Sequence, residues 1–358
     1  MDHQPVPAPP TPAPGVHGQL VNDTELNTFT IHTDDRIEID SDADDSSSDA
    51  GYFTDSIVSA TTSISSSVRD YTFENGWRYH KFREGIYNFP NDDLEQDRED
   101  MKHAMMVKLC GHKLHFAPIG TNPQNVLDIG TGTGIWAIEM GDLYSGSKVL
   151  GVDLSPIQPE WVPPNVTFVV DDIESPWLKP LNYFDYIHTR HTVMAIKNWP
   201  LLMRQAYDHL KPGGWIELQE MHHYPQCSDA SMPPNYAVIQ YWSRIGEALA
   251  TLGINFNATL LLESMLREAG FINVSCQVLH VPIGVWPKNR TLKLVGLYWR
   301  TILIDGLQPI ALGPLTRGLH WSKEDVESWL VDVKKAYLDS SVHSHIPLYI
   351  VCGQKPPG

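Results

Sequence analysis

The stretch "NVLDIGTGTGIWAIEM", which starts at Asn125, constrains the fold more than any other part of the chain. A short apolar run ends in Asp128, and glycine then occupies every second position, at Gly130, Gly132 and Gly134. The apolar spacing then becomes helical, so the stretch predicts a strand, a tight turn and a helix. Glycines at such a turn let the backbone approach a ligand closely, with free N–H groups directed at it.

Further strands are predicted at Lys148–Asp153, Val166–Val170 and Phe184–Thr189. A helix from Pro200 has apolar residues at steps of four, "KPGG" stops it, and the strand "WIELQE" follows. Helices dominate the C-terminal third, where strands from Ile272 and at "HIPLYIVCGQ" complete the sheet. Alternating strands and helices predict an α/β fold with a mostly parallel sheet and helices on both faces.

The first 70 residues differ from the rest in composition. They carry 13 of the acidic residues and only 2 of the basic ones, a net charge of −11 out of −17 for the chain. Runs such as "PVPAPPTPAPG" and "DSDADDSSSDA" cannot bury enough apolar surface to offset their ordering entropy, so residues 1–70 are predicted to be disordered. The tail is either a solvating segment or a partner-binding arm with Ser and Thr phosphorylation sites.

The segment 71–120 is aromatic and then helical. Asn91 or Asp92 can cap the helix, and its apolar residues Leu94, Met101 and Met105 fall on one face. Its aromatic part either closes over a ligand as a lid or packs on the sheet as core.

Several classes of protein are disfavoured by composition. The N-terminus lacks the basic and apolar regions of a signal peptide, and no apolar run approaches the roughly 18 residues of a membrane span. The four cysteines are widely spaced, which indicates a reducing compartment, cytoplasm or nucleus. The acidic balance disfavours nucleic acid as a partner.

The glycine turn alone leaves the ligand open. Gly132-x-Gly134-x-x-Ala137 also satisfies the loose dinucleotide pattern, with Asp153 where a ribose-binding acid is expected. However, Asp128 could meet an ammonium group, which S-adenosylmethionine has and a dinucleotide lacks. Asp153 can accept from ribose hydroxyls, and Asp172, after a third strand, from the adenine amine. Each acid alone is more commonly a turn or cap residue, but together they favour an S-adenosylmethionine site.

Six blocks of sequence resemble the fungal LaeA-like methyltransferases: "ENGWRYHKFREGIYNFPNDDLEQDRED", "VLDIGTGTGIWAIEM", "GVDLSPIQPEWVPPNVTF", "DDIESPW", "FDYIHTRHTVMAIKNWP" and "LKPGGWIELQE". The resemblance spans roughly residues 71–356. It implies a Rossmann-like class I methyltransferase fold, with a seven-stranded sheet whose last strand is antiparallel and with helical C-terminal additions. On that basis we divide residues 71–358 into a lid and helix segment at 71–120, a cofactor-binding core at 121–223 and a helical acceptor region at 224–358.

The resemblance also implies site residues. Those on the methionine and ribose side are Asp128, Gly130, Thr131, Gly132 and Gly134, followed by Asp153 and Leu154 at the ribose and by Asp172 and Ile173 at the adenine. The methyl acceptor would be a natural-product intermediate or a protein. Alternatively, the chain would be a regulatory binding module with velvet-type protein partners, whose effect does not depend on methyl transfer.

Methyl transfer from a sulfonium depends mainly on alignment, and a base is needed only if the acceptor must lose a proton. The sequence leaves the catalytic residue open, with His191 and Glu220 as candidates in the pocket. Metal ligation is not predicted, because no acid or cysteine completes a ligand set around His188 and His191 or around His343 and His345. Trp242, Trp286, Tyr298 and Trp299 either line an acceptor pocket or pack in the core.

Overall fold

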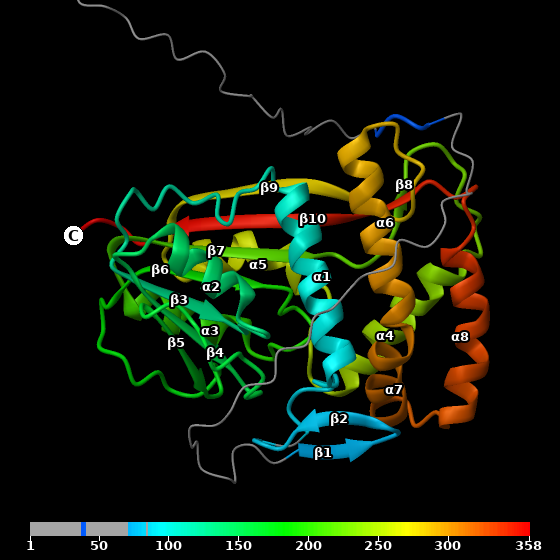
Figure 1. Cartoon of the computed structure of the whole chain (residues 1–358), viewed down its shortest axis with the longest axis horizontal. Helices are drawn as coiled ribbons and strands as arrows, with labels where there is room; N and C mark the ends of the chain where they lie inside the picture. Colours follow the sequence, from blue (N-terminus) through cyan, green and yellow to red (C-terminus); the bar gives the residue numbers. More distant parts are fainter. Residues whose placement is uncertain (1–36, 41–70, 84) are drawn as a thin grey trace, which may run out of the picture. The chain divides into compact units, whose positions relative to one another are not determined.

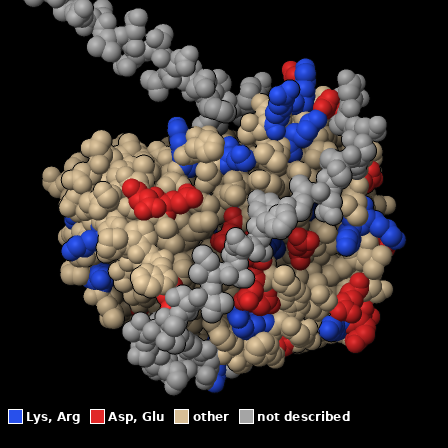
Figure 2. Space-filling model, viewed as in Figure 1, with Lys and Arg blue, Asp and Glu red and all other residues tan. Residues whose placement is uncertain are grey.

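The computed structural model describes residues 37–40, 71–83 and 85–358. The predicted disorder of residues 1–70 therefore falls, apart from 37–40, outside the described residues. By difference, residues 71–358 carry a net charge of −6, from −17 for the chain and −11 for residues 1–70. On the face shown in Figure 2, the described Lys and Arg side chains lie among Asp and Glu and form no continuous basic stripe.

The centre of the fold is a sheet with the strand order β5-β4-β3-β6-β7-β10-β8, in which β9 also pairs with β10. The strands from β5 to β7 run parallel, whereas β10 is antiparallel to all its neighbours. This confirms the predicted mostly parallel sheet with an antiparallel last strand; the two-residue β8 adds an eighth strand. The strands are β3 (Asn125–Ile129), β4 (Lys148–Asp153), β5 (Val166–Val170), β6 (Phe184–Arg190), β7 (Leu210–Met221), β8 (Gln226–Cys227), β9 (Ile272–Pro282) and β10 (Ser344–Gln354).

Helices cover both faces of this sheet and gather beyond one of its ends. The short α2 lies on one face and α3 and α5 on the other, while α4, α6, α7 and α8 stand beyond the carboxyl ends of the parallel strands (Figure 1). Their bounds are α1 (Asp93–Leu109), α2 (Ile135–Leu143), α3 (Trp199–His209), α4 (Ala237–Thr251), η1 (Ala258–Leu261), α5 (Leu262–Glu268), α6 (Arg290–Asp305), α7 (Leu307–Gly318) and α8 (Lys323–Tyr337).

The strand predicted after "KPGG" begins earlier than expected. Strand β7 starts at Leu210 and includes that tetrapeptide, because the backbone of Gly213 and Gly214 exchanges hydrogen bonds with Lys355 beyond β10. The helix α3 still ends at His209, and Asn198 caps its start. The residues after β10 thus pair with the start of β7. This pairing lies at the amino ends of the parallel strands, opposite the cavity described below.

A hairpin precedes the sheet. Strands β1 (Tyr71–Glu74) and β2 (Trp77–His80) pair across the two-residue turn Asn75-Gly76, both with positive φ. Asn-Gly is a common signal for such a hairpin, although the hairpin was not among the predicted elements. The hairpin leads into α1, which Asp92 caps as predicted by accepting from the amide of Glu95.

The predicted apolar face of α1 is only partly correct. Met105 is fully buried, but Leu94 is 71% exposed. The inner face of this helix is instead formed largely by charged residues, which line the cavity described below. Helix α1 crosses in front of the carboxyl ends of β3 and β6 and packs on α6 (Figure 1).

Candidate functional site

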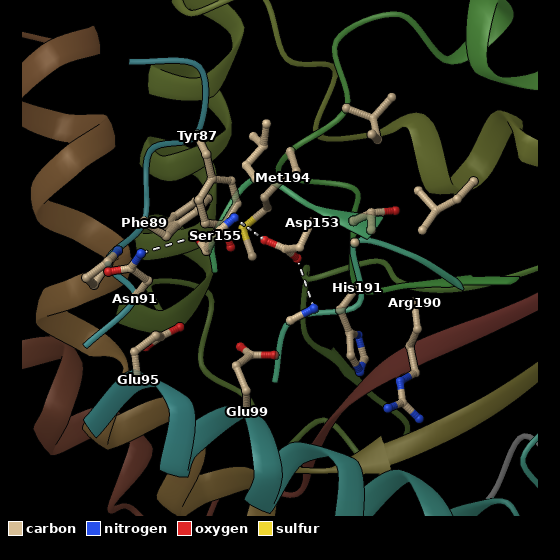
Figure 3. A pocket seen from close by; sticks show the side chains of 18 of the residues that line it. Tyr87, Phe89, Asn91, Glu95, Glu99, Asp153, Ser155, Arg190, His191 and Met194 are labelled. Atoms are coloured by element: carbon tan, nitrogen blue, oxygen red, sulfur yellow. Dashed lines mark hydrogen bonds between the residues drawn. The ribbon is translucent and has the colours of Figure 1, made fainter. Parts of the chain in front are cut away.

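A cavity opens at the carboxyl ends of β3, β4 and β6, which is the edge where open α/β sheets bind ligands. Its other walls come from the segment before α1 and from helices α1, α4, α6 and α7. The empty space within it, with the open solvent at its mouth included, is about 1420 Å³. Figure 3 shows acidic side chains approaching it from opposite sides.

The glycine turn forms the floor of the cavity. All three glycines have positive φ, +66° at Gly130, +56° at Gly132 and +83° at Gly134. A Cβ on Gly130 would lie 2.8 Å from Thr192, and one on Gly134 would lie 2.3 Å from the Phe168 ring, whereas one on Gly132 would meet no protein atom within 4 Å. Only Gly130 and Gly132 line the cavity; Gly134 begins α2 and is required by packing.

Asp153, at the end of β4, is held by backbone donors. The amides of Gly132 and Ser155 donate to its two carboxylate oxygens, each at 2.9 Å (Figure 3). Burial raises the pKa of Asp153 in spite of these bonds. The side-chain amide of Asn91, in the segment before α1, donates to the hydroxyl of Ser155 at 3.2 Å. Asp153 is thus linked, through Ser155, to the segment before α1 that forms one wall of the cavity.

Asp172 follows β5 on the same edge. Its Oδ1 accepts from the amide of Glu174 at 2.9 Å, and its Oδ2 accepts from the guanidinium of Arg83 at 2.6 Å. The ion pair between Arg83 and Asp172 is a second link between the segment before α1 and the ends of the parallel strands. Leu154 and Ile173, the other residues predicted beside the strand-end acids, also line the cavity.

Asp128 lies in a smaller chamber that shares Gly130 and Gly132 with the main cavity. The hydroxyl of Thr131 donates to Oδ2 of Asp128 at 2.6 Å, and Nδ1 of His188 lies 2.8 Å from Oδ1. The His188 ring is stacked on Trp136, with ring centroids 3.7 Å apart. The carboxylate is therefore fixed in position before any ligand binds.

A row of charged side chains on α1, which was not predicted from the sequence, also lines the cavity: Glu95, Arg98, Glu99 and Lys102. Arg98 contacts both acids, with 2.8 Å between its Nη2 and Oε1 of Glu99, and Lys102 donates to the same oxygen at 2.7 Å. Among the described residues, no donor reaches Oε2 of Glu99, and Figure 3 shows this side chain directed into the cavity.

Burial and pairing shift the pKa values in this row in opposite directions. Burial raises the pKa of Glu95 and lowers that of Lys102. Burial alone would raise the pKa of Glu99 too, but Lys102 and Arg98 outweigh it and lower this pKa. The spacing i, i+3, i+4 and i+7 places the four residues on one helix face. Because such a face is usually solvated, its burial could not be predicted from the sequence.

The end of the cavity formed by α4, α6 and α7 is apolar and is lined by Trp242, Trp299, Leu303 and Ile310. Two further aromatic side chains that line the cavity, Tyr87 and Phe89, lie beside Ser155 and Asp153 (Figure 3). The suggested lining residues Trp286 and Tyr298 do not reach the cavity: Trp286 donates its indole N–H to the carbonyl of Ser344 instead. The nearby His223 is buried, which lowers its pKa to about 3 and keeps the ring uncharged at neutral pH.

His191 lies where the two parts of the cavity meet. It follows β6 directly, lines both chambers and has a positive φ of +58°, which is uncommon outside glycine. Burial, followed by the charges of Lys102 and Arg190, lowers its pKa well below the ordinary value. Among the described residues, nothing hydrogen-bonds to its Nε2. An uncharged imidazole with a free nitrogen can accept a proton.

Glu220, the other catalytic candidate, does not line the cavity. It is fully buried in β7 and accepts from both the amide and the hydroxyl of Thr192, at 2.8 and 2.7 Å, and from the amide of Val193 at 3.0 Å. It therefore fixes the loop after β6, whose residues 192 and 194–196 line the cavity. Burial raises the pKa of Glu220 to about 7 despite these donors.

Glu220 makes stability depend on pH. Because folding raises its pKa from 4.5 to about 7, its contribution is complete below pH 4.5 and is lost as the pH rises through 7. We expect the free energy of unfolding to fall between pH 5 and pH 8 by about 2 kcal/mol more in the wild type than in Glu220→Gln. Chemical denaturation at both pH values measures this difference. Equal slopes in the two proteins would contradict the assignment, and Glu217→Gln controls for changing a buried carboxyl in the same strand.

Among the residues that the structure describes, no three His, Cys, Asp or Glu side chains are grouped so that they could hold a metal ion. Nor is any helix in those ranges both long and apolar enough to cross a membrane.

Comparison with known proteins identifies similarity to methyltransferases and to regulators of fungal secondary metabolism. A family model of methyltransferase domains matches residues 98–275. The methyltransferase pytC of Aspergillus terreus is 38% identical over 322 residues, covering 90% of this chain and 96% of that protein. The secondary metabolism regulator LAE1 of Cochliobolus heterostrophus is 36% identical, covering 79% and 94%. The protein-methionine methyltransferase laeA of Emericella nidulans is 32% identical, covering 79% and 76%.

Proposed function

The chain belongs to the LaeA-like methyltransferase family, and from that premise we propose that it transfers a methyl group from S-adenosylmethionine to a small, largely apolar molecule of fungal secondary metabolism. One observation carries the proposal most directly. Acids from the ends of three neighbouring strands, Asp128, Asp153 and Asp172, line two chambers that share Gly130 and Gly132 of the glycine turn.

The residues present fit this cofactor. Asp128 would receive the ammonium group, because its carboxylate is already oriented by Thr131 and His188. Asp153 would accept from the ribose hydroxyls, and Asp172 with Ile173 would hold the adenine. The open space over Gly132 leaves room for close approach of the ligand to the backbone. When bound, S-adenosylmethionine supplies an electrophilic methyl group on a sulfonium.

The apolar end of the cavity would hold the acceptor. Trp242 and Trp299 offer flat apolar walls, and His223 next to them is uncharged. Arg98 and Lys102, the cavity-lining cations of α1, are paired with acids. Arg190, which also lines the cavity, contacts Nδ1 of His103. From the apolar walls we infer a largely apolar acceptor that presents a hydroxyl or another protic group.

His191 would remove the proton of that group. It lines both the main cavity and the smaller chamber that holds Asp128, and its lowered pKa keeps the imidazole uncharged at neutral pH. Its strained backbone conformation, fixed by a hydrogen bond from its amide to the carbonyl of Gln219, is typical of functional positions.

We expect His191→Asn to lower kcat by about 100-fold or more with a protic acceptor, because general base catalysis contributes roughly that much. Asparagine tolerates the positive φ, so the fold should persist. The affinity for S-adenosylhomocysteine should change by less than about threefold, or roughly 0.7 kcal/mol. The matched variant is His222→Asn, outside the cavity. A kcat close to that of the wild type would exclude His191 as the base.

The proposed activity is tested with purified protein, methyl-labelled S-adenosylmethionine and an extract from cells that lack this protein. Label is counted separately in small molecules, protein and nucleic acid, with Asp128→Ala run in parallel. We expect label in the small-molecule fraction that disappears in the variant. Variant-sensitive label in protein would instead identify a protein methyltransferase and contradict our choice of acceptor.

Absence of variant-sensitive label, despite measured binding of S-adenosylhomocysteine, would favour the regulatory binding module. That alternative also predicts that the strand-end acids can be replaced without loss of the biological effect. Location in the cytoplasm or nucleus stays a prediction of the sequence.

A further inference from the structure

A short segment of the acidic tail, Ile37–Asp40, is bound to the loop between β9 and α6. Ile39 forms an antiparallel bridge with Pro287. Two backbone hydrogen bonds of 2.8 Å flank this bridge, from the amide of Asp40 to the carbonyl of Trp286 and from the amide of Lys288 to the carbonyl of Glu38. Figure 1 shows the segment, in blue, beside the upper end of α6. The contact is a single β-bridge outside the named strands, and it uses the same backbone pairing by which an extended peptide binds to an exposed edge.

Charge reinforces the pairing. Glu38 and Asp40 are two residues apart, so their side chains leave the same side of an extended segment. Glu38 forms an ion pair with Lys288 at 3.1 Å, and Asp40 forms one with Lys293 in the first turn of α6. Figure 2 shows blue and red side chains next to one another at this upper edge of the molecule. The edge therefore selects an extended peptide with acids at alternate positions.

The bound loop rests directly on a wall of the cavity. The amide of Gly284 donates to the carbonyl of Gly296 in α6 at 3.0 Å, and a Cβ on Gly296 would lie only 2.0 Å from the carbonyl oxygen of Gly284. One turn further along α6, Trp299 lines the apolar end of the cavity. An interaction that restricts the motion of the loop between β9 and α6 therefore also restricts the motion of the α6 wall.

We propose that Trp286–Lys293 is a binding site for an extended acidic peptide segment, that the chain's own Ile37–Asp40 is its occupant, and that this docking holds the α6 wall in place. The few bonds involved must offset the entropy of fixing four backbone residues, and the Glu38–Lys288 pair is largely exposed. The docked segment is therefore released easily, and salt weakens its binding. The acidic tail thus acts on the wall of the acceptor end.

The test measures hydrogen–deuterium exchange in the full chain. The variant Glu38→Lys/Asp40→Lys reverses the charge of the segment without altering the loop or α6. We expect exchange in residues 286–299 to become at least about tenfold faster. Adding Lys288→Glu/Lys293→Glu to this variant should restore the exchange rate to within about threefold of the wild type, because the pairs are re-formed with opposite signs. The control Asp42→Lys/Asp44→Lys has the same charge change and spacing outside the docked segment.

Unchanged exchange in Glu38→Lys/Asp40→Lys would overturn the proposal. So would an equal acceleration in the Asp42→Lys/Asp44→Lys control, which would assign the effect to net charge, or failure of the four-site charge swap to restore protection. The readout does not depend on methyl transfer. An incorrect acceptor assignment would therefore leave the exchange result intact, and the two proposals fail separately.

Discussion

Replacing Asp128 by alanine should weaken binding of S-adenosylhomocysteine by about 10- to 100-fold, since a charge-assisted hydrogen bond is worth roughly 1.5–3 kcal/mol. The wild-type carboxylate is held in position by Thr131 and His188, so ligand binding need not reorder it. The variant loses the negative charge and leaves these two partners unsatisfied. Isothermal titration with S-adenosylhomocysteine measures the affinity, and thermal unfolding of the free protein shows whether the fold persists.

Asp185 provides the matched control. It lies on β6 away from the cavity, accepts from the amides of Gln124 and Asn125, and forms an ion pair with Lys211. We expect Asp185→Ala to reduce stability yet to bind S-adenosylhomocysteine with almost the wild-type affinity. An equal loss of affinity in both variants would mean that Asp128 acts through the fold alone. An unchanged affinity in Asp128→Ala would remove this residue from the proposed site.

The strand-turn-helix unit around the glycines could be predicted from sequence because local and global signals agree there. Apolar β-branched runs must be buried strands, and alternating glycines before a helical pattern leave few backbone conformations. Parallel strands have their carboxyl ends at one edge, so Asp128, Asp153 and Asp172 had to lie near one another. What could not be predicted is that each acid already has protein partners, because those partners include Arg83, which is 89 residues away from Asp172.

The α1 wall of the cavity depends on tertiary context. Glu95 and Glu99 have a spacing typical of a solvated helix face, and only the position of α1 in front of the sheet turns this face inward (Figure 3). Glu220 shows the converse. Strand alternation predicts that Glu220 faces a pocket. Instead, the loop after β6 folds over Glu220, and its backbone N–H groups donate to both carboxylate oxygens. The sequence pattern predicts which residues share one face of a helix or strand. Which other part of the chain packs against that face depends on the tertiary fold.

Gly134 and Gly132 should respond differently to the same added methyl group. Gly134→Ala combines a strained positive φ with a Cβ that would lie 2.3 Å from the Phe168 ring, so the start of α2 and β5 must move apart. Strain of about 1 kcal/mol and overpacking of about 1–3 kcal/mol together predict a loss of roughly 2–4 kcal/mol in the free energy of unfolding. Chemical denaturation of the ligand-free proteins measures the loss.

Gly132→Ala adds a Cβ that meets no protein atom within 4 Å, so only the backbone strain remains and stability should fall by about 1 kcal/mol. Because Gly132 lines both chambers, the new methyl group would instead occupy space needed by the ligand, and affinity for S-adenosylhomocysteine should fall by tenfold or more, or about 1.4 kcal/mol. Comparing Gly134→Ala with Gly132→Ala thus distinguishes an effect on packing from an effect on ligand binding within the same turn. If Gly132→Ala bound the ligand as tightly as the wild type, the ligand could not lie over this glycine, and the cofactor half of the site would have to be placed elsewhere in the cavity.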